Sequence, residues 1–332
     1  MDPEAENFYK SLEVLDSNIN LIFPLIMIPF GTIANLLTLI IYNQKPFKNT
    51  SIGFYYSCLS IVDSLALCIG SIKFYLINTN IISSVKILAI ACKFFITNTY
   101  IFSEYSAWIL VVTSLDRLVT ILNYPSLFFI RTKTFRKICL IILFLILALL
   151  NSPSLIYLRV TIEEIDITVN ETTLYYTCEL ERDSIYNDQF RDVLDLFLFA
   201  LMPFAFMILS NGLISYKIIK SKNKFKRRMS LVRKKNANKE YQLAMTIIGT
   251  NFLFLLLNLP ICVVQIARNF MNDSNFSLRM RLNLVYTISN ILSYINLSSS
   301  LFINLVFNHI FKRKFFQMFQ IISRRKTTCS KN

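Results

Sequence analysis

Residues 138–158 read ICLIILFLILALLNSPSLIYL and contain no Asp, Glu, Lys or Arg. Crossing the roughly 30 Å hydrocarbon core of a bilayer takes about 20 helical residues. Because lipid offers no hydrogen bonds to an unpaired backbone, a spanning segment must satisfy its own N–H and C=O groups, which a helix does. This stretch is therefore predicted to be a membrane-spanning helix, and packed membrane helices tolerate a kink such as the one expected at Pro153.

Six further windows of similar length carry little or no charge. They cover about residues 19–43, 51–76, 91–118, 194–216, 241–267 and 282–308. The windows do not alternate polar and apolar residues, which argues against an outer-membrane barrel. Apolar residues make up 54% of the 332 residues and charged residues only 17%. The predicted fold class is an all-α membrane protein, a seven-transmembrane helix bundle over residues 19–308.

The basic residues lie mainly on one side of the predicted bundle. With the N-terminus outside, 24 of the 35 Lys and Arg residues fall in loops and a tail that would face the cytoplasm. The positive-inside rule then places segment 1–18 outside the cell and segment 309–332 in the cytoplasm of a multi-pass plasma-membrane protein. Since the basic residues flank spans in the lipid bilayer, the net charge of +15 does not indicate a nucleic-acid partner.

Residues for common enzymatic chemistry are scarce in this sequence. His309 is the single histidine, and there is no CxxC pair. These facts exclude a His-rich zinc site and an HExxH motif, so we do not expect an enzyme.

Polar residues and prolines occupy particular places within the spans. Asp63 lies inside the second span, where a carboxylate is costly and marks a functional site by default. Cys92 lies at the start of the third span, and Asp116-Arg117 ends it. The first and later spans contribute further landmarks: Asn35, Pro203, Phe254, Pro260, Asn304 and Asn308. Single motifs are weak, but the order and spacing of the whole set are specific.

This set of residues resembles the rhodopsin-like (class A) G-protein-coupled receptors over the whole chain. The form is divergent and most similar to neuropeptide receptors of the FMRFamide type. Leu118 replaces the Tyr of the Asp-Arg-Tyr motif, Asn258 replaces the helix-six Trp, and residues 304–308 read NLVFN in place of NPxxY. The resemblance implies an extracellular ligand and a heterotrimeric G protein as partners, while the departures leave the details of the activation switch open.

The resemblance also assigns roles to residues inside the bundle. The switch and the G-protein coupling would use Asp116, Arg117, Glu240, Phe254, Pro260, Asn304 and Asn308. Glu240 would pair with Arg117 in the resting state, although a solvated acid at a helix start is an equal alternative. An allosteric sodium ion would be held by Asp63, Ser106, Ser300 and Asn304. The alternative for these four residues is a purely structural polar network.

The ligand of such a receptor would enter an outer cavity. Its contacts would include Thr99, Tyr100, Glu104 and Gln265. Thr99 replaces the Asp of amine receptors and Ser298 replaces the retinal lysine of opsins, so neither ligand class is expected. The loop from Arg159 to Arg191 is acidic and would steer a cationic ligand. We therefore expect a cationic or amidated neuropeptide, although the acids would equally serve only to keep the loop soluble.

The same outer loop carries three further features. In this family a cysteine at the place of Cys92 is bonded to the second outer loop, where Cys178 is the only cysteine. Residues 174–178 have a composition typical of a strand, and many peptide receptors have a hairpin there. Asn170 begins a glycosylation sequon.

Segment 309–332 begins with an amphipathic stretch, which predicts a short eighth helix at the membrane surface. Cys329 would be palmitoylated or remain a free thiol. Two other functions stay open: a receptor for a non-peptide small molecule or chemosensory ligand, and more remotely a small transporter or channel. A transporter would want charged residues spread along a pathway and an inverted repeat, whereas Asp63 and Glu104 are the deep charges of the predicted spans.

Overall fold

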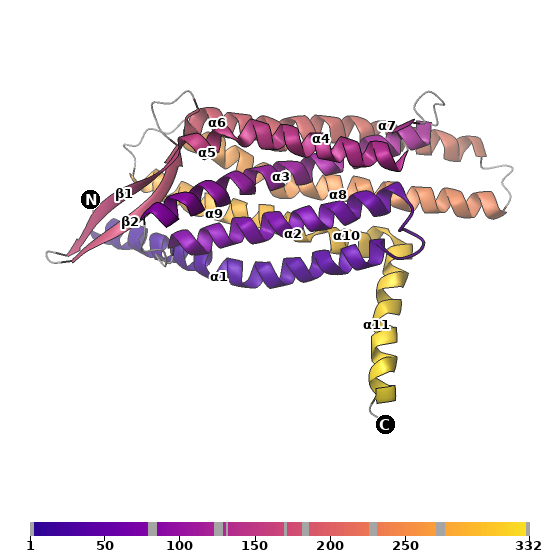
Figure 1. The fold of residues 1–332 in the computed structure, drawn as a ribbon, viewed down its shortest axis with the longest axis horizontal. Helices are drawn as coiled ribbons and strands as arrows, with labels where there is room; N and C mark the ends of the chain where they lie inside the picture. Colours follow the sequence, from indigo (N-terminus) through magenta and orange to yellow (C-terminus); the bar gives the residue numbers. More distant parts are fainter. Residues whose placement is uncertain are drawn as a thin grey trace.

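The computed structural model of the chain describes residues 3–78, 85–122, 129–130, 132–168, 171–180, 186–225, 231–269 and 276–329. Its long helices run side by side along one axis and form a single bundle (Figure 1). A β-hairpin and the N-terminus lie at one end of the bundle, and the last helix projects from the other end (Figure 1). These two ends are called the hairpin end and the α11 end.

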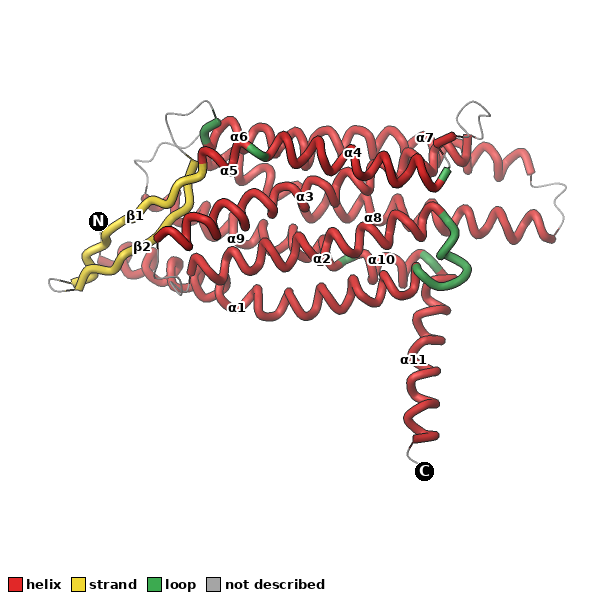
Figure 2. The backbone as a smooth tube through the Cα atoms, viewed as in Figure 1, coloured by secondary structure: helices red, strands yellow, loops and turns green. Residues whose placement is uncertain are grey.

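Helices make up most of the described chain, as Figure 2 shows. The α-helices are α1 (Pro3–Tyr42), α2 (Ser51–Asn78), α3 (Val85–Leu122), α4 (Lys133–Asn151), α5 (Pro153–Tyr157), α6 (Asp188–Asp195), α7 (Met202–Phe225), α8 (Leu231–Asn269), α9 (Phe276–Ser298), α10 (Ser300–Phe307) and α11 (His309–Cys329). A π-helical segment, η2 (Leu196–Leu201), joins α6 to α7, and the described strands are β1 (Leu158–Thr168) and β2 (Glu171–Leu180).

Within the described residues, six helical segments are long and apolar enough to cross a membrane. The pair α9–α10, which bends by 55°, supplies the seventh span. The predicted fold class, a seven-transmembrane helix bundle, is therefore confirmed. Several helices are longer than the apolar windows that predicted them, since α1 begins at Pro3 and α8 at Leu231. An apolar window marks the part of a helix that lies in lipid, whereas the hydrogen-bonded helix continues into water.

Prolines interrupt two of the spans. The fourth span is divided between α4 and α5 at Pro153, which has no N–H to continue the ladder of hydrogen bonds. The fifth span contains η2 directly before Pro203, and the Met202 N–H bonds five residues back to the Phe197 carbonyl. A π-helical turn of this kind absorbs the register that the proline disrupts.

The bundle has polar groups inside and apolar side chains outside. Leu149 and Ile90 are 73% and 70% exposed, whereas Asn35 and Asn304 are fully buried. In water this distribution would be unstable, but in lipid the apolar surface is already solvated. Each deep polar group then needs a partner within the protein, and these partners define the candidate functional site.

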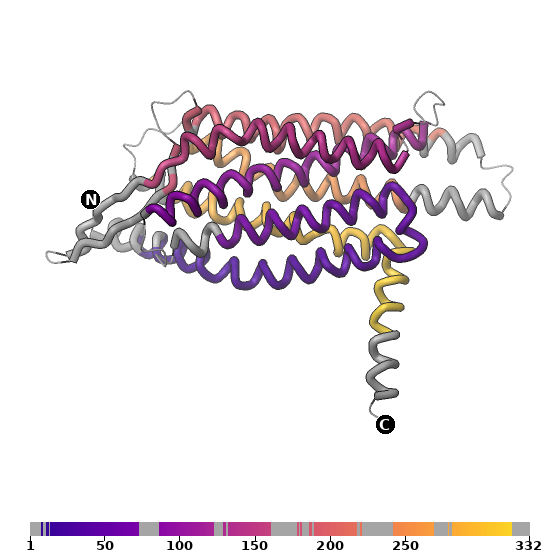
Figure 3. Tube along the Cα trace, in the orientation of Figure 1, coloured from indigo at the N-terminus to yellow at the C-terminus, as the bar shows by residue number. Residues whose placement is uncertain are grey.

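The first and last spans close the bundle, as the sequence colours of Figure 3 show. The Asn35 side chain on α1 donates a hydrogen bond to the Leu297 carbonyl on α9, over 3.0 Å. Nearby, the rings of Phe30 and Phe302 stack with centroids 5.9 Å apart. The conformation of α1 is thus coupled to the bend between α9 and α10.

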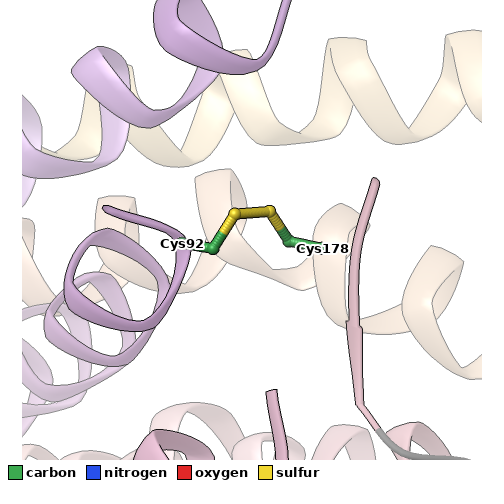
Figure 4. The surroundings of a disulfide bond; sticks show 2 residues. All are labelled: Cys92 and Cys178. Carbon is green, nitrogen blue, oxygen red and sulfur yellow. A yellow bond between two sulfur atoms is a disulfide. The ribbon is translucent and has the colours of Figure 1, made fainter. Parts of the chain in front are cut away.

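The hairpin lies across one end of the bundle and is bonded to α3. Strands β1 and β2 pair antiparallel, with Val160 opposite Cys178. Cys178 forms a disulfide with Cys92 on α3, with Cα atoms 6.1 Å apart (Figure 4). The disulfide and the strand predicted at residues 174–178 are therefore confirmed. The bond ties the loop between the fourth and fifth spans to the end of α3.

Helix α11 leaves the end of the bundle and runs transverse to the long helices (Figure 1). Its Phe311 side chain is fully buried, with its ring centroid 5.3 Å from that of Tyr42 and 6.5 Å from that of Phe47. The aromatic contacts fix the start of α11 against α1 and the turn that follows it. The predicted eighth helix is present at this place in the chain.

Candidate functional site

A cavity of about 60 Å³ lies between helices in the hairpin half of the bundle. Its lining comes from α3, α6, η2, α8 and α9, and consists of Thr99, Tyr100, Ser103, Asp195, Phe199, Ile261, Gln265, Tyr286, Asn290, Ser293 and Tyr294. The structure thus brings together three of the residues predicted to contact a ligand, Thr99, Tyr100 and Gln265. The walls combine aromatic rings with hydroxyl, amide and carboxylate groups, which suits an amphipathic ligand.

Glu104, the fourth predicted ligand contact, does not line this cavity. Its carboxylate is 1% exposed and accepts a hydrogen bond from the Asn151 amide on α4, over 2.7 Å. Glu104 was predicted as a contact from its position in the third span, one turn after Tyr100 on the same side of α3. A buried carboxylate needs a hydrogen-bonding partner, and Asn151 supplies one away from the cavity.

Two charged residues of the site were missed by the sequence analysis. Asp195 lines the cavity, is 8% exposed and forms a side-chain hydrogen bond with Gln265. Arg191, one turn earlier on α6, is 5% exposed, and its guanidinium carbon lies 3.4 Å from the ring centroid of Tyr100. The sequence RDVLD at residues 191–195 could have indicated this pair, because opposite charges four residues apart lie on the same face of a helix.

Helix α6 begins with a local hydrogen bond that holds these charges in place. The Asn187 side chain accepts a hydrogen bond from the Phe190 N–H over 2.9 Å. This N-cap satisfies an end group that the helix itself leaves unpaired. The short helix therefore starts at a defined residue, and Arg191 and Asp195 face the bundle from it.

The residues predicted to hold sodium form two hydrogen-bonded groups in the middle of the bundle. Ser106 on α3 donates to the Asp63 carboxylate on α2, over 2.5 Å. Asn304 is fully buried, donates to the Ser300 carbonyl and accepts from the Tyr42 hydroxyl. The oxygen atoms of Asp63, Ser106, Ser300 and Asn304 are of the type that a hard cation takes, and Asp63 is only 3% exposed. The donor chemistry therefore fits a sodium ion.

The predicted coupling residues on α3 lie near the α11 end. Arg117 donates a hydrogen bond to the Ser51 hydroxyl on α2, over 2.6 Å. Asp116 lies 3.8 Å from the Arg136 guanidinium on α4. Asp116 and Arg117 thus both contact neighbouring helices, and at 4% and 5% exposed both are buried.

A sequence profile described as 7 transmembrane receptor (rhodopsin family) matches residues 34–298, which is most of the chain. This chain belongs to the rhodopsin family of seven-transmembrane receptors. It is a membrane receptor, and the predicted resemblance to this family is confirmed. Among curated proteins, no match to the sequence was found.

The receptor departs from its family at Asn258, and the structure shows the local consequence. Asn258 donates to the Phe254 carbonyl over 2.7 Å and accepts from the Ser293 hydroxyl on α9 over 2.6 Å. The Phe254 ring lies edge-on to that of Phe199, with centroids 5.6 Å apart. A polar link between α8 and α9 thus occupies the place of a bulky ring, two residues before Pro260.

The receptor's second departure lies at the end of the seventh span. The Asn308 side chain accepts a hydrogen bond from the Phe311 N–H over 3.1 Å. This is the bond of an N-cap, so Asn308 starts α11 at His309. Asn304 and Asn308 therefore have different hydrogen-bond partners, although both were predicted to belong to the same activation switch.

Three predictions concern residues whose side chains the structure does not describe. Residue 240 lies within α8 and residue 329 ends α11, but the described side chains do not include Glu240 or Cys329. Asn170 falls between the described strands. The Arg117–Glu240 pair, palmitoylation and glycosylation thus remain predictions.

Proposed function

We propose that this receptor binds an extracellular ligand in the cavity of the hairpin half and activates a heterotrimeric G protein at the α11 end. The observation that carries the proposal is the arrangement of α3. Tyr100 lines the cavity in one half of this helix, and Arg117 lies near its other end. Occupancy of the cavity and the position of Arg117 are therefore mechanically linked through a single helix.

The proposed orientation places the hairpin end outside the cell and α11 in the cytoplasm of a plasma-membrane protein. The 24 basic residues that flank the α11 end in the sequence support this orientation. A disulfide at the hairpin end agrees with it, because disulfides persist in oxidising compartments. The receptor acts by this conformational route and not as an enzyme.

The proposed ligand is a cationic or amidated neuropeptide. The segment from Arg159 to Arg191 carries many more acids than bases and would concentrate cations at the entrance. Much of this charged segment forms the hairpin, which the Cys92–Cys178 disulfide ties to the end of α3. A second candidate is a non-peptide small molecule, which the small cavity of about 60 Å³ favours.

The proposed mechanism starts from a closed α11 end. Tyr56 and Thr250 hydroxyls lie 2.9 Å apart and join α2 to α8, while Asn251 joins α8 to α3. Ligand binding would favour a state in which α8 swings outward about Pro260 and these bonds break. A ligand shifts this equilibrium only by its difference in affinity for the two states. Arg117 would then leave Ser51 and contact the G protein.

A sodium ion would act in this scheme through Asp63, Ser106, Ser300 and Asn304. The ion would supply a positive charge next to a carboxylate whose partner in the structure is a neutral hydroxyl. An ion that binds only the closed arrangement of these residues would oppose activation.

The decisive experiment measures ligand-dependent nucleotide exchange on a G protein by the receptor in lipid vesicles. Arg117→Ala, at matched receptor density in the vesicles, is expected to abolish the response, and a full response would refute the mechanism. Ion flux or substrate uptake by the same vesicles, without nucleotide exchange, would instead identify a channel or transporter. Amidated peptides and small non-peptide compounds are screened side by side to separate the two ligand classes.

A further inference from the structure

We propose that Arg191 and Asp195 form a subsite for a terminal carboxamide of the ligand. The carbonyl oxygen of that group would accept hydrogen bonds from Arg191, and its –NH2 would donate to Asp195. This inference rests on the proposed function, because it names the chemical group that enters the cavity.

The two residues lie next to each other and next to the cavity. They are four residues apart on α6, a spacing that places both side chains on one face of a helix. Asp195 lines the cavity directly. Arg191 lies against the ring of Tyr100, which also lines the cavity, with 3.4 Å from the guanidinium carbon to the ring centroid. A group bound against Tyr100 is thus within reach of both charges.

Arg191 has unused hydrogen-bonding capacity. It is 5% exposed, and its Nε and Nη2 atoms donate to no residue within the part of the chain that the structure describes. A buried donor without an acceptor costs about 1–3 kcal/mol, and more for a charged group. The guanidinium presents its donors in a fixed planar fork, which matches a planar acceptor. A ligand oxygen at this place would satisfy donors that the receptor leaves unpaired.

The surrounding charges select among ligand groups. An ammonium would be attracted to Asp195 but repelled by the adjacent Arg191. A carboxylate would be attracted to Arg191 but repelled by the carboxylate of Asp195, which lines the cavity. A primary carboxamide is neutral and carries both an acceptor and a donor on one plane. It alone among these three groups satisfies Arg191 and Asp195 without a like-charge contact.

The size of the cavity agrees with a small polar group. A volume of about 60 Å³ holds only about two water molecules, since each occupies roughly 30 Å³ in the liquid. A carboxamide fits this space, whereas an aromatic ring needs the walls to separate. The remainder of a peptide would extend toward the hairpin and its acidic residues.

The test measures ligand binding in the absence of a G protein. The carboxamide subsite is therefore tested separately from the proposed signalling function. Full-length receptor in lipid nanodiscs is titrated with the N-acetyl amides of the twenty common amino acids and with the matching N-acetyl amino acids, by saturation-transfer NMR. The expected result is that an amide binds and that its free acid binds about tenfold more weakly, as loss of a hydrogen bond to a charged group predicts.

Two substitutions locate the subsite. Arg191→Gln is expected to weaken the amide about tenfold, and Asp195→Asn is expected to reduce the preference for amide over acid. Arg313→Gln, at an exposed arginine of α11 at the other end of the bundle, is the matched control and should leave the affinity and the preference unchanged. Equal binding of acids and amides, or no binding by any amide, would overturn the proposal even if either variant failed to fold.

The outcomes for the two proposals are separable. If the amides bind as expected but no ligand promotes nucleotide exchange, the subsite stands and the proposed signalling function fails. If peptides promote exchange with equal potency as amides and acids, the signalling function stands and the carboxamide subsite is wrong.

Discussion

The amide of Asn251 on α8 donates a hydrogen bond to the hydroxyl of Ser114 on α3, with 2.8 Å between nitrogen and oxygen. Both side chains are buried, at 4% and 0% exposed. Ser114 lies one turn before Arg117, so the bond joins the two helices that activation is proposed to separate. It is a neutral link between α3 and α8, at residues that the sequence analysis did not select.

Asn251→Ala is expected to raise ligand-independent signalling. Removing one such hydrogen bond costs the closed state about 1 kcal/mol, which changes the balance of states about fivefold. Basal nucleotide exchange at matched receptor density measures this change. Asn98→Ala serves as control, because Asn98 bonds only within its own helix to the Phe94 carbonyl in the part of the chain that the structure describes. Unchanged basal exchange in a well-expressed Asn251→Ala receptor would contradict the assignment.

Asn258 and Ser293 are expected to act as one unit. Each single substitution to Ala should lower the thermal unfolding midpoint, and the double variant should lower it little further, because either change removes the same 2.6 Å bond. Thermal denaturation of the purified variants measures this. Ser289→Ala is the additive control, since Ser289 bonds to Val285 on its own helix. Strict additivity of Asn258→Ala and Ser293→Ala would show that the two side chains contribute separately.

Asn151→Leu is expected to destabilise the receptor through Glu104. The substitution removes the amide that donates to a carboxylate with 1% exposure, at a cost of about 2 kcal/mol. Adding Glu104→Leu to this variant should restore much of the loss, because no buried carboxylate then lacks its donor. Thermal denaturation of the single and double variants measures the effect. A double variant less stable than Asn151→Leu alone would argue that Glu104 has another essential partner.

Replacing sodium chloride with choline chloride is expected to raise basal exchange in the native receptor. The ion would bind the closed arrangement around Asp63, so its removal favours the open state. Asp63→Asn should abolish the response to the cation, whereas Glu104→Gln, which changes a buried carboxylate in the third span, should retain it. A response that persists unchanged in Asp63→Asn would favour a purely structural polar network.

The membrane-spanning helices could be predicted from the sequence, because the lipid environment strongly restricts their backbone and side chains. Apolar windows located the spans, because each spanning backbone must be helical and each lipid-facing side chain apolar. The Cys92–Cys178 bond followed only from the family resemblance, and the structure confirms it. The ends of α1 and α8 were not predictable from hydropathy, since a helix continues beyond the lipid without an apolar signal.

The candidate cavity was predicted in part, and the misses have a common cause. Thr99, Tyr100 and Gln265 were selected by their places along apolar helices, and they do line the cavity. Asp195 is the second residue of the span predicted at residues 194–216. A charged residue at that place is easily mistaken for the end of the membrane-spanning segment. The partner of Glu104 comes from α4, and the periodicity of α3 carries no information about a neighbouring helix. Side-chain partners across helices depend on packing that only the fold defines.

The direction of α11 has a consequence for how deeply the receptor sits in its bilayer. Helix α11 points away from the bundle, transverse to its long helices (Figure 1), and its start is anchored by the buried Phe311. Its exposed Phe316 and Phe319, at 53% and 46%, can therefore enter the membrane interface. Sliding the bundle along the membrane normal would pull these rings into water or push the basic start of α11 into hydrocarbon. Helix α11 is therefore expected to set the depth of the bundle in the bilayer, and with it the height of Arg117 relative to the lipid headgroups.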